Sequence, residues 1–162
     1  MTVFVCVDKK MGVLFQGKRQ SKDRMLRKRI LDIVESANAK LTITNYSYEQ
    51  FRIDERDGLL NVQDKLDFKN DDYVFVEDKE SLNNLPWENT DELVLCCWER
   101  NYPADTFLHK PEGVDCTLKR KETVLGNSHD MTLEFYNVKT RKKPGKIFRK
   151  GNRRSFKGNA TK

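Results

Sequence analysis

The distribution of charge divides the chain into two parts and confines the folded part to residues 1–138. Residues 139–162 contain eleven Lys or Arg and no Asp or Glu. The whole chain has 31 basic and 25 acidic side chains, so residues 1–138 carry 20 basic and 25 acidic ones. Their formal charge is −5, whereas that of residues 139–162 is +11. A segment so rich in like charges cannot bury a core, and we expect residues 139–162 to be a basic, flexible tail. The first 138 residues are enough for one domain.

The cysteines and the start of the chain favour an intracellular protein. No cysteine belongs to a C-x-x-C or paired Cys/His motif, and three lie in apolar runs, which predicts buried, reduced thiols at Cys6, Cys96, Cys97 and Cys116. The N-terminus has no charged leader, and no apolar stretch approaches the length of a membrane span. We therefore expect a cytoplasmic protein without a membrane partner. The two histidines, His109 and His129, lack metal-ligand spacing, so no metal site is predicted.

The apolar pattern predicts an α/β fold with a mixed sheet. Short β-rich runs typical of strands covered on both faces occupy residues 2–8, 41–44, 73–77 and 92–98. A stripe at helical spacing predicts a helix that begins after Ser21 and fades near Asn38. Residues 9–20 are predicted as a loop and residues 54–72, with seven acidic side chains, as a solvated connection. Residues 114–124 and 131–138 alternate as two strands of a closing antiparallel hairpin.

In their order along the chain, five segments resemble dihydrofolate reductase. They are the strand end and loop at 7–13, the acidic helix start at 23–26, the strand and turn at 43–49 (a worn form of Gly-Arg-x-Thr-Trp-Glu), the strand at 93–98 with Asp-Thr-x-Phe-like residues 105–107, and the closing hairpin from 126 to 138. The resemblance covers most of residues 2–138 and implies a domain with that family's fold. Residues 20–24 and 98–105 are also similar to the Gln-Ser-x-Asp-Arg and Trp-x-Arg-x-Tyr-Pro-x-Asp stretches of a set of uncharacterised bacterial proteins. Some of these carry a ribonuclease Z label, but two histidines do not make a dinuclear metal site.

The resemblance implies a small-molecule site around Asp23. In the family, a carboxylate at this position binds the substrate ring and assists proton delivery, and Thr106 would hydrogen-bond to Asp23 across the pocket. The other side chains placed at the ligand are Phe15, Arg19, Gln20, Ile43, Ser47, Trp98 and Arg100. Each has a plainer interpretation. Asp23 suits an exposed helix start, and Thr106 suits a strand end. Arg100 would pair with Asp23, Asp105 or an anionic ligand in a pocket wall, and its plainer interpretation is one surface ion pair at a strand end capped by a Pro turn.

The cofactor is left unknown by the sequence. The family holds NADPH with a Gly-Gly turn at a helix start, and residues 73–98 contain no Gly. In the second turn, Thr44 and Asn45 stand where the family has a Gly and a basic residue. NADPH is therefore still possible as the cofactor, but the residues that the family uses to bind its phosphates are absent.

The basic tail suggests a different partner. Its basic residues are interleaved with two phenylalanines, a composition suited to phosphate contacts and to stacking on unpaired bases. The side chains predicted to contact nucleic acid are Arg141, Lys142, Lys143, Lys146, Phe148, Arg149, Lys150, Arg153, Arg154 and Phe156. The alternatives are a solubilising extension, or a tail that docks on the acidic residues 54–72. Two functions follow. The first is a divergent reductase-like domain that binds a small planar or nucleotide-like ligand, either with enzyme activity or after losing it. The second is a non-enzymatic module that binds RNA, DNA or a ribonucleoprotein through its tail.

Overall fold

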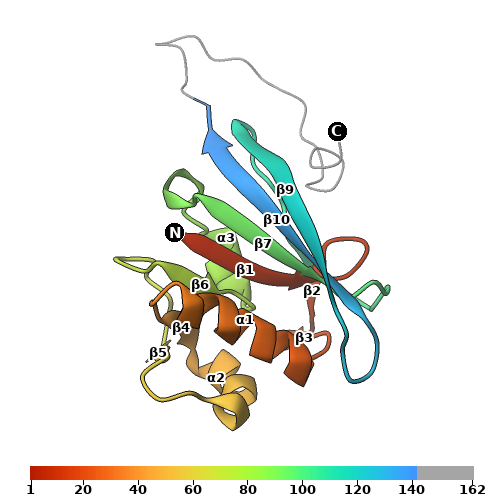
Figure 1. Ribbon diagram of the computed structural model, residues 1–162. Helices are drawn as coiled ribbons and strands as arrows, with labels where there is room; N and C mark the ends of the chain where they lie inside the picture. Colours follow the sequence, from red (N-terminus) through yellow and green to blue (C-terminus); the bar gives the residue numbers. More distant parts are fainter. Residues whose placement is uncertain (142–162) are drawn as a thin grey trace.

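A mixed seven-stranded sheet forms the centre of the computed structural model, which describes residues 1–141 (Figure 1). Its strand order is β5 (Leu60–Gln63), β4 (Leu41–Thr44), β6 (Tyr73–Phe75), β1 (Thr2–Val7), β7 (Glu92–Cys97), β10 (Met131–Thr140) and β9 (Val114–Val124). Neighbouring strands from β5 to β7 are parallel, whereas β10 is antiparallel to both β7 and β9. The predicted α/β class with a closing antiparallel pair is confirmed.

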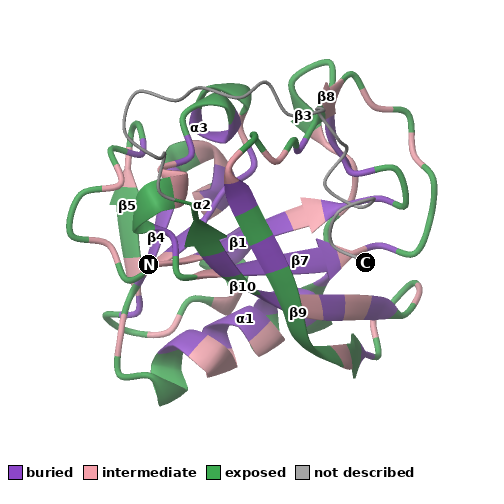
Figure 2. Cartoon of the chain, turned by 90° about the horizontal axis from the view of Figure 1, so that it is seen from above, coloured by how far each residue is buried: buried purple, intermediate pink, exposed green. Residues whose placement is uncertain are grey.

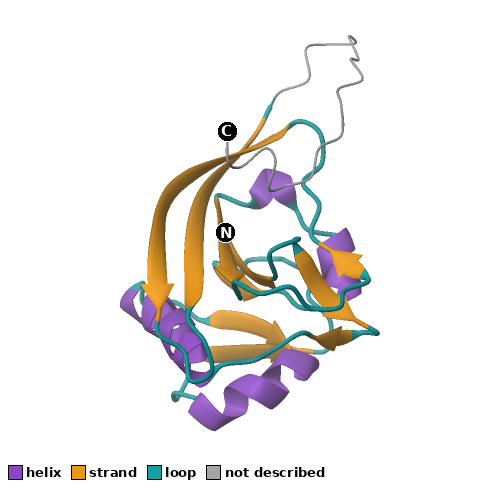
Figure 3. Cartoon of the chain, turned by 90° about the vertical axis from the view of Figure 1, so that its right-hand side faces the viewer, coloured by secondary structure: helices purple, strands orange, loops and turns teal. Residues whose placement is uncertain are grey.

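The apolar runs become central strands because both faces of the sheet are covered. Phe4 and Val94 face one apolar cluster, and Val3 and Leu93 face the other. Helix α1 (Arg24–Ser36) and the end of α2 (Asn45–Phe51) pack into the first cluster, and α3 (Lys79–Asn83) packs into the second. Figure 3 shows the helices around the curved sheet, and the purple strands in Figure 2 mark the buried centre.

Helix α1 follows the predicted apolar stripe only in part. Leu26, Ile30 and Val34 are buried against the sheet, but Met25 is 37% exposed. The helix ends at Ser36, and Asn38 takes a φ of 54°, a left-handed conformation that Asn tolerates and that stops a helix. The predicted end near Asn38 is thereby confirmed.

Several short elements are absent from the sequence prediction. Residues 9–20, expected as a loop, contain β2 (Gly12–Phe15) and β3 (Lys18–Arg19), which with β8 (Thr106–Phe107) form a second, three-stranded sheet. The acidic connection contains the edge strand β5 and follows the 3-10 turn Arg52–Asp54; a second such turn is Trp87–Asn89. Strands of two to four residues are too short to show a period of two, so their pairing partners define them instead.

The strand directions define two opposite edges of the sheet. The parallel strands β1, β4, β6 and β7 all end at one edge, which we call the carboxyl edge. Because β10 runs antiparallel, with Asn137 opposite Glu92 at the start of β7, it ends at the other, amino edge. Arg141 follows there, and its N–H donates to the carbonyl of Gly113 at 2.7 Å. The described part of the chain therefore ends at the edge opposite the carboxyl edge.

Within residues 1–141, no helix has the length and apolar character needed to cross a membrane.

Candidate functional site

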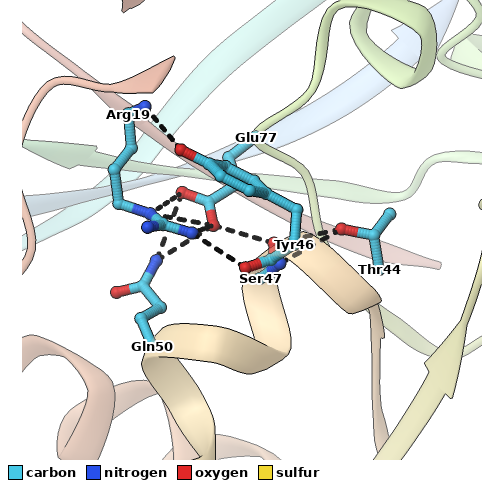
Figure 4. Close-up of polar contacts among 6 residues, drawn as sticks. All are labelled: Arg19, Thr44, Tyr46, Ser47, Gln50 and Glu77. Carbon is cyan, nitrogen blue, oxygen red and sulfur yellow. Dashed lines mark hydrogen bonds and ion pairs between the residues drawn. The ribbon is translucent and has the colours of Figure 1, made fainter. Parts of the chain in front are cut away.

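The predicted site residues Arg19 and Ser47 meet at the carboxyl edge around Glu77 (Figure 4). Glu77 follows β6 and is only 4% exposed. The Arg19 guanidinium donates from Nε to Oε1 at 3.1 Å and from Nη2 to Oε2 at 3.0 Å, a bidentate ion pair. This pair ties the β2–β3 hairpin to the end of β6.

Helix α2 supplies the remaining donors to Glu77. Ser47 Oγ donates to Oε2 at 2.8 Å, and Gln50 Nε2 donates to Oε2 at 3.0 Å. Residues 47 and 50 are three apart, which places both side chains on one face of the helix. The helix begins here because Thr44, at the end of β4, is its N-cap and accepts from the Ser47 N–H at 3.2 Å.

Tyr46 fixes the arginine from its other side. Its ring lies 4.0 Å from the Arg19 guanidinium carbon, a cation–π contact. Its hydroxyl accepts from the Arg19 backbone N–H at 2.9 Å, and its carbonyl accepts from Arg19 Nη2 at 3.0 Å. Burial alone would lower the pKa of Arg19, but the hydrogen bond and charge of Glu77 outweigh it and raise the pKa. The guanidinium is therefore held as a cation.

Arg19, Tyr46, Ser47, Gln50 and Glu77 form what we call the Arg19–Glu77 cluster. The two carboxylate oxygens of Glu77 accept from three side chains, which uses the acceptor capacity of a carboxylate. The cluster pairs its two charges and satisfies them internally. These hydrogen bonds hold β6, α2 and the β2–β3 hairpin together. They leave no oxygen of Glu77 directed at a ligand.

A second buried carboxylate, Asp8, organises the neighbouring loops. Asp8 follows β1 and is 2% exposed. Its Oδ1 accepts from the N–H groups of Lys10 and Gly12 at 2.9 and 2.8 Å, and its Oδ2 accepts from Gln20 Nε2 and the Tyr102 N–H, both at 3.1 Å. The predicted ligand residue Gln20 is thus bound to Asp8. Its Oε1 is buried without a hydrogen-bond partner in the described structure.

Gly12 allows these loops to approach one another. A Cβ added at residue 12 would lie 2.6 Å from the Cβ of Ala104 and 3.0 Å from Asp8 Oδ2. The missing side chain is therefore required by close packing rather than by contact with a phosphate.

Asp23, the predicted catalytic acid, is the N-cap of α1. It is 5% exposed, and its Oδ1 accepts from the N–H groups of Met25 and Leu26 at 2.8 and 3.2 Å. Its Oδ2 accepts from the Asn127 N–H at 2.8 Å, in the turn between β9 and β10. The carboxylate is neither exposed, as the plainer interpretation held, nor directed at an open pocket; it joins the helix to the hairpin turn.

The predicted partners of Asp23 lie elsewhere. The Thr106 hydroxyl donates to Asp105 Oδ1 at 3.2 Å, so the predicted hydrogen bond from Thr106 to Asp23 is wrong. The physical reason is that β8 pairs with β2, with Thr106 opposite Leu14. The exposed Arg100 forms no ion pair with Asp23 or Asp105 among the described residues, so a pairing with either acid is also wrong; Asp105 accepts from the Gln16 N–H and the Thr106 hydroxyl instead. Pairing of Arg100 with an anionic ligand stays a prediction.

The expected pocket wall is divided between the core and the surface. Ile43 and Trp98 are 0% and 1% exposed and pack in the core on the α1 face, whereas Phe15 is 41% exposed. The Trp98 ring centroid lies 5.7 Å from that of His129, whose two ring nitrogens are buried without hydrogen-bond partners in residues 1–141. These side chains do not form one surface for a planar ligand.

A small cavity lies on the face of the sheet opposite α1, beside β7. It has a volume of about 20 Å³, and its lining includes Asp8, Leu95, Cys97, Glu134 and Tyr136. This volume holds about one water molecule. Desolvation, and then the Tyr136 hydroxyl's hydrogen bond to Glu134 at 2.7 Å, raise the pKa of Tyr136. No group of three or more potential metal ligands occurs in residues 1–141.

The carboxyl edge does not fit NADPH. A dinucleotide pyrophosphate needs backbone N–H groups or cations. Here Glu77 and Asp78 separate β6 from α3, Asp78 uses its carboxylate on the Ser81 N–H, and the nearby cation Arg19 is paired with Glu77. Phosphates placed there would meet two carboxylates.

Sequence reasoning missed Glu77, Asp8 and Gln50. A signal existed for the two acids, since each is the first charged residue after a buried strand. Polar side chains at the carboxyl ends of parallel strands gather at one edge. No pattern distinguished Gln50 from other polar residues of its short helix.

The predicted nucleic-acid contacts fall almost entirely outside the described residues. Arg141 is the exception, and its Nε lies 3.4 Å from Asp115 Oδ2. The others, which lie beyond residue 141, are Lys142, Lys143, Lys146, Phe148, Arg149, Lys150, Arg153, Arg154 and Phe156. Among known proteins, no family model matches the chain, and no curated protein matches its sequence significantly.

Proposed function

We propose that the chain is a non-enzymatic module that binds single-stranded nucleic acid through residues 139–162, which are carried on a domain of dihydrofolate reductase-like fold. The observation that carries the proposal is the separation of charge: eleven basic and no acidic residues follow a body of charge −5. Such a body repels phosphates, so affinity for a polyanion must come from the basic segment.

The fold assignment is supported by the order of the elements. A central first strand leads through a loop into a helix that begins after Asp23, and an antiparallel hairpin closes the sheet beside β7. This agrees with the order of the five segments that resemble the reductase.

The contacts at the carboxyl edge favour a binding module over an enzyme. Asp23 directs its oxygens at three backbone N–H groups, and Glu77 directs its oxygens at three side chains. Both oxygens of each carboxylate accept hydrogen bonds from the chain itself, so the contacts do not favour the small planar ligand.

Single strands suit the basic segment better than duplex DNA does. Phe148 and Phe156 lie among its basic residues. A ring that stacks on an unpaired base contributes about 1–3 kcal/mol, whereas bases in a duplex are already stacked. Each phosphate neutralised adds roughly −0.7 to the slope of log affinity against log salt for a single strand.

Truncating the chain after Arg141 should weaken its binding to a fluorescein-labelled oligouridylate at least about tenfold, because nine of the eleven basic residues of the segment are removed. Fluorescence anisotropy at several salt concentrations measures both the affinity and its salt slope, which should become flatter.

The Phe148→Ala/Phe156→Ala variant should bind the oligonucleotide more weakly, with an unchanged salt slope. Circular dichroism should show the truncated body folded.

The matched control is Arg100→Gln, an exposed basic side chain of the body that was expected at the small-molecule site. It should bind the oligonucleotide as the unmodified protein does. Equal binding by the truncated and the full chain would overturn the proposal.

A further inference from the structure

Two cysteines face each other across neighbouring strands. Cys6 in β1 and Cys96 in β7 are direct partners in the parallel register of these strands. Both side chains belong to the apolar cluster on the α1 face of the sheet, together with Phe4 and Val94, the preceding pair on that face. Register and face therefore place the two thiols side by side.

The spacing of the strands suits a covalent link. Neighbouring strands lie about 4.7–4.9 Å apart, and the Cα atoms of a disulfide are usually about 4.4–6.8 Å apart. The Cβ atoms of a disulfide approach to about 3.5–4.5 Å, so the bond would draw the two strands slightly together. A link formed under such strain is more easily reduced than a relaxed one.

The other cysteines are excluded by the same geometry. Cys97 follows Cys96 directly and therefore points to the opposite face of the sheet. Cys116 belongs to that opposite cluster, and its register partner is Val138. Only one pair of the four thiols is both in register and on one face.

The environment of the pair sets how it reacts. Cys96 is buried and Cys6 is partly exposed, so Cys6 is the thiol that a small oxidant reaches first. The neighbouring Cys96 thiol, and then burial, raise the pKa of Cys6 well above its ordinary value. Because the thiolate is the reactive form, the pair should be slow to respond and should need sustained oxidant.

We propose that Cys6 and Cys96 are a modification site, a dithiol that a hydroperoxide converts to a cross-strand disulfide. The Cys6 thiolate attacks the peroxide O–O bond, forms a sulfenic acid and releases one water after protonation. Cys96 then attacks the Cys6 sulfur, forming the S–S bond and releasing the second water. Two thiols lose two hydrogens and two electrons, and hydrogen peroxide is reduced to two waters. A thiol such as dithiothreitol reverses the reaction.

The test treats the reduced full chain with hydrogen peroxide, then denatures and alkylates it with N-ethylmaleimide. The number of alkylated thiols should fall from four to two. The intact mass before alkylation should fall by two hydrogens. Tryptic digestion should give one disulfide-linked species that joins residues 1–9 to residues 80–100, and dithiothreitol should separate it.

Serine variants assign the bond. Cys97→Ser and Cys116→Ser should each still form the linked species, and Cys97→Ser removes the ambiguity within residues 80–100. Cys6→Ser and Cys96→Ser should lose it and retain three alkylated thiols. Four alkylated thiols after treatment of the folded protein, or a linkage to Cys97, to Cys116 or between two chains, would overturn the proposal. If a variant fails to fold, fragmentation of the linked peptide from the unmodified protein by tandem mass spectrometry shows whether the bond is on Cys96 or Cys97.

Discussion

Replacing Glu77 by alanine is expected to lower the free energy of unfolding by about 3–5 kcal/mol, the range for breaking a buried ion pair by removal of one partner. The change leaves the Arg19 guanidinium, whose side chain is 16% exposed, without its counter-ion. It also removes the acceptor of Ser47 and Gln50, two buried donors. Urea unfolding followed by circular dichroism measures the loss.

The matched control is Glu49→Ala, because Glu49 is an exposed carboxylate on the same helix α2. Its effect should stay within about 0.5 kcal/mol. A double-mutant cycle with Arg19→Ala and Glu77→Ala then isolates the contribution of the ion pair. The double variant should lose clearly less free energy of unfolding than the sum of the two single losses. A loss below about 1 kcal/mol for Glu77→Ala would show that the cluster does not hold the hairpin, α2 and β6 together.

Replacing Asp23 by alanine is expected to lower the free energy of unfolding by about 2–4 kcal/mol, from loss of a helix N-cap and of the acceptor for the Asn127 N–H. Asp23→Asn should cost less, because the amide oxygen can still cap the helix. Urea unfolding gives the loss, and hydrogen exchange at the Asn127 amide should accelerate in Asp23→Ala.

Oligonucleotide affinity separates the structural role of Asp23 from a role in binding nucleic acid. Both Asp23 variants should bind oligouridylate as the unmodified protein does, because Asp23 lies far in sequence from residues 139–162 and acts between α1 and the hairpin turn. Asp130→Ala, an exposed carboxylate in the same connection, is the control and should change stability by no more than about 0.5 kcal/mol. A stability loss no larger than that for Asp23→Ala would contradict the assigned role.

The sequence predicted the long, regular parts of the fold because their patterns are local. The runs at 2–8 and 92–98 are apolar since β1 and β7 are covered on both faces, and the alternation at 114–124 and 131–138 marks the closing hairpin. The strand β8 pairs with β2, and β5 pairs with β4, across distant parts of the chain, whereas β2 and β3 form a hairpin too short to show a period of two. No window of two to four residues contains that information.

The sequence predicted some residues of the candidate site but not what they surround. Arg19 and Ser47 were expected at one site, and the fold brings them together, but around Glu77 rather than a ligand. Sequence alone could not show that β6 ends opposite the β2–β3 hairpin, which turns Glu77 into the partner of Arg19. The bond from Asp23 to Asn127 spans 104 residues, and for the same reason it has no local signal.

The central claim is that the chain's own charges fill the carboxyl edge, and an NADPH titration of the chain ending at Arg141 tests it most directly. This truncation prevents the basic segment from binding the nucleotide phosphates. A ligand at 100 times its Kd adds about 2.7 kcal/mol to stability, which would raise the Tm by about 9 °C in a domain of this size. The account predicts no change in Tm at millimolar NADPH. A saturable rise in Tm, abolished by Arg19→Ala, would contradict it.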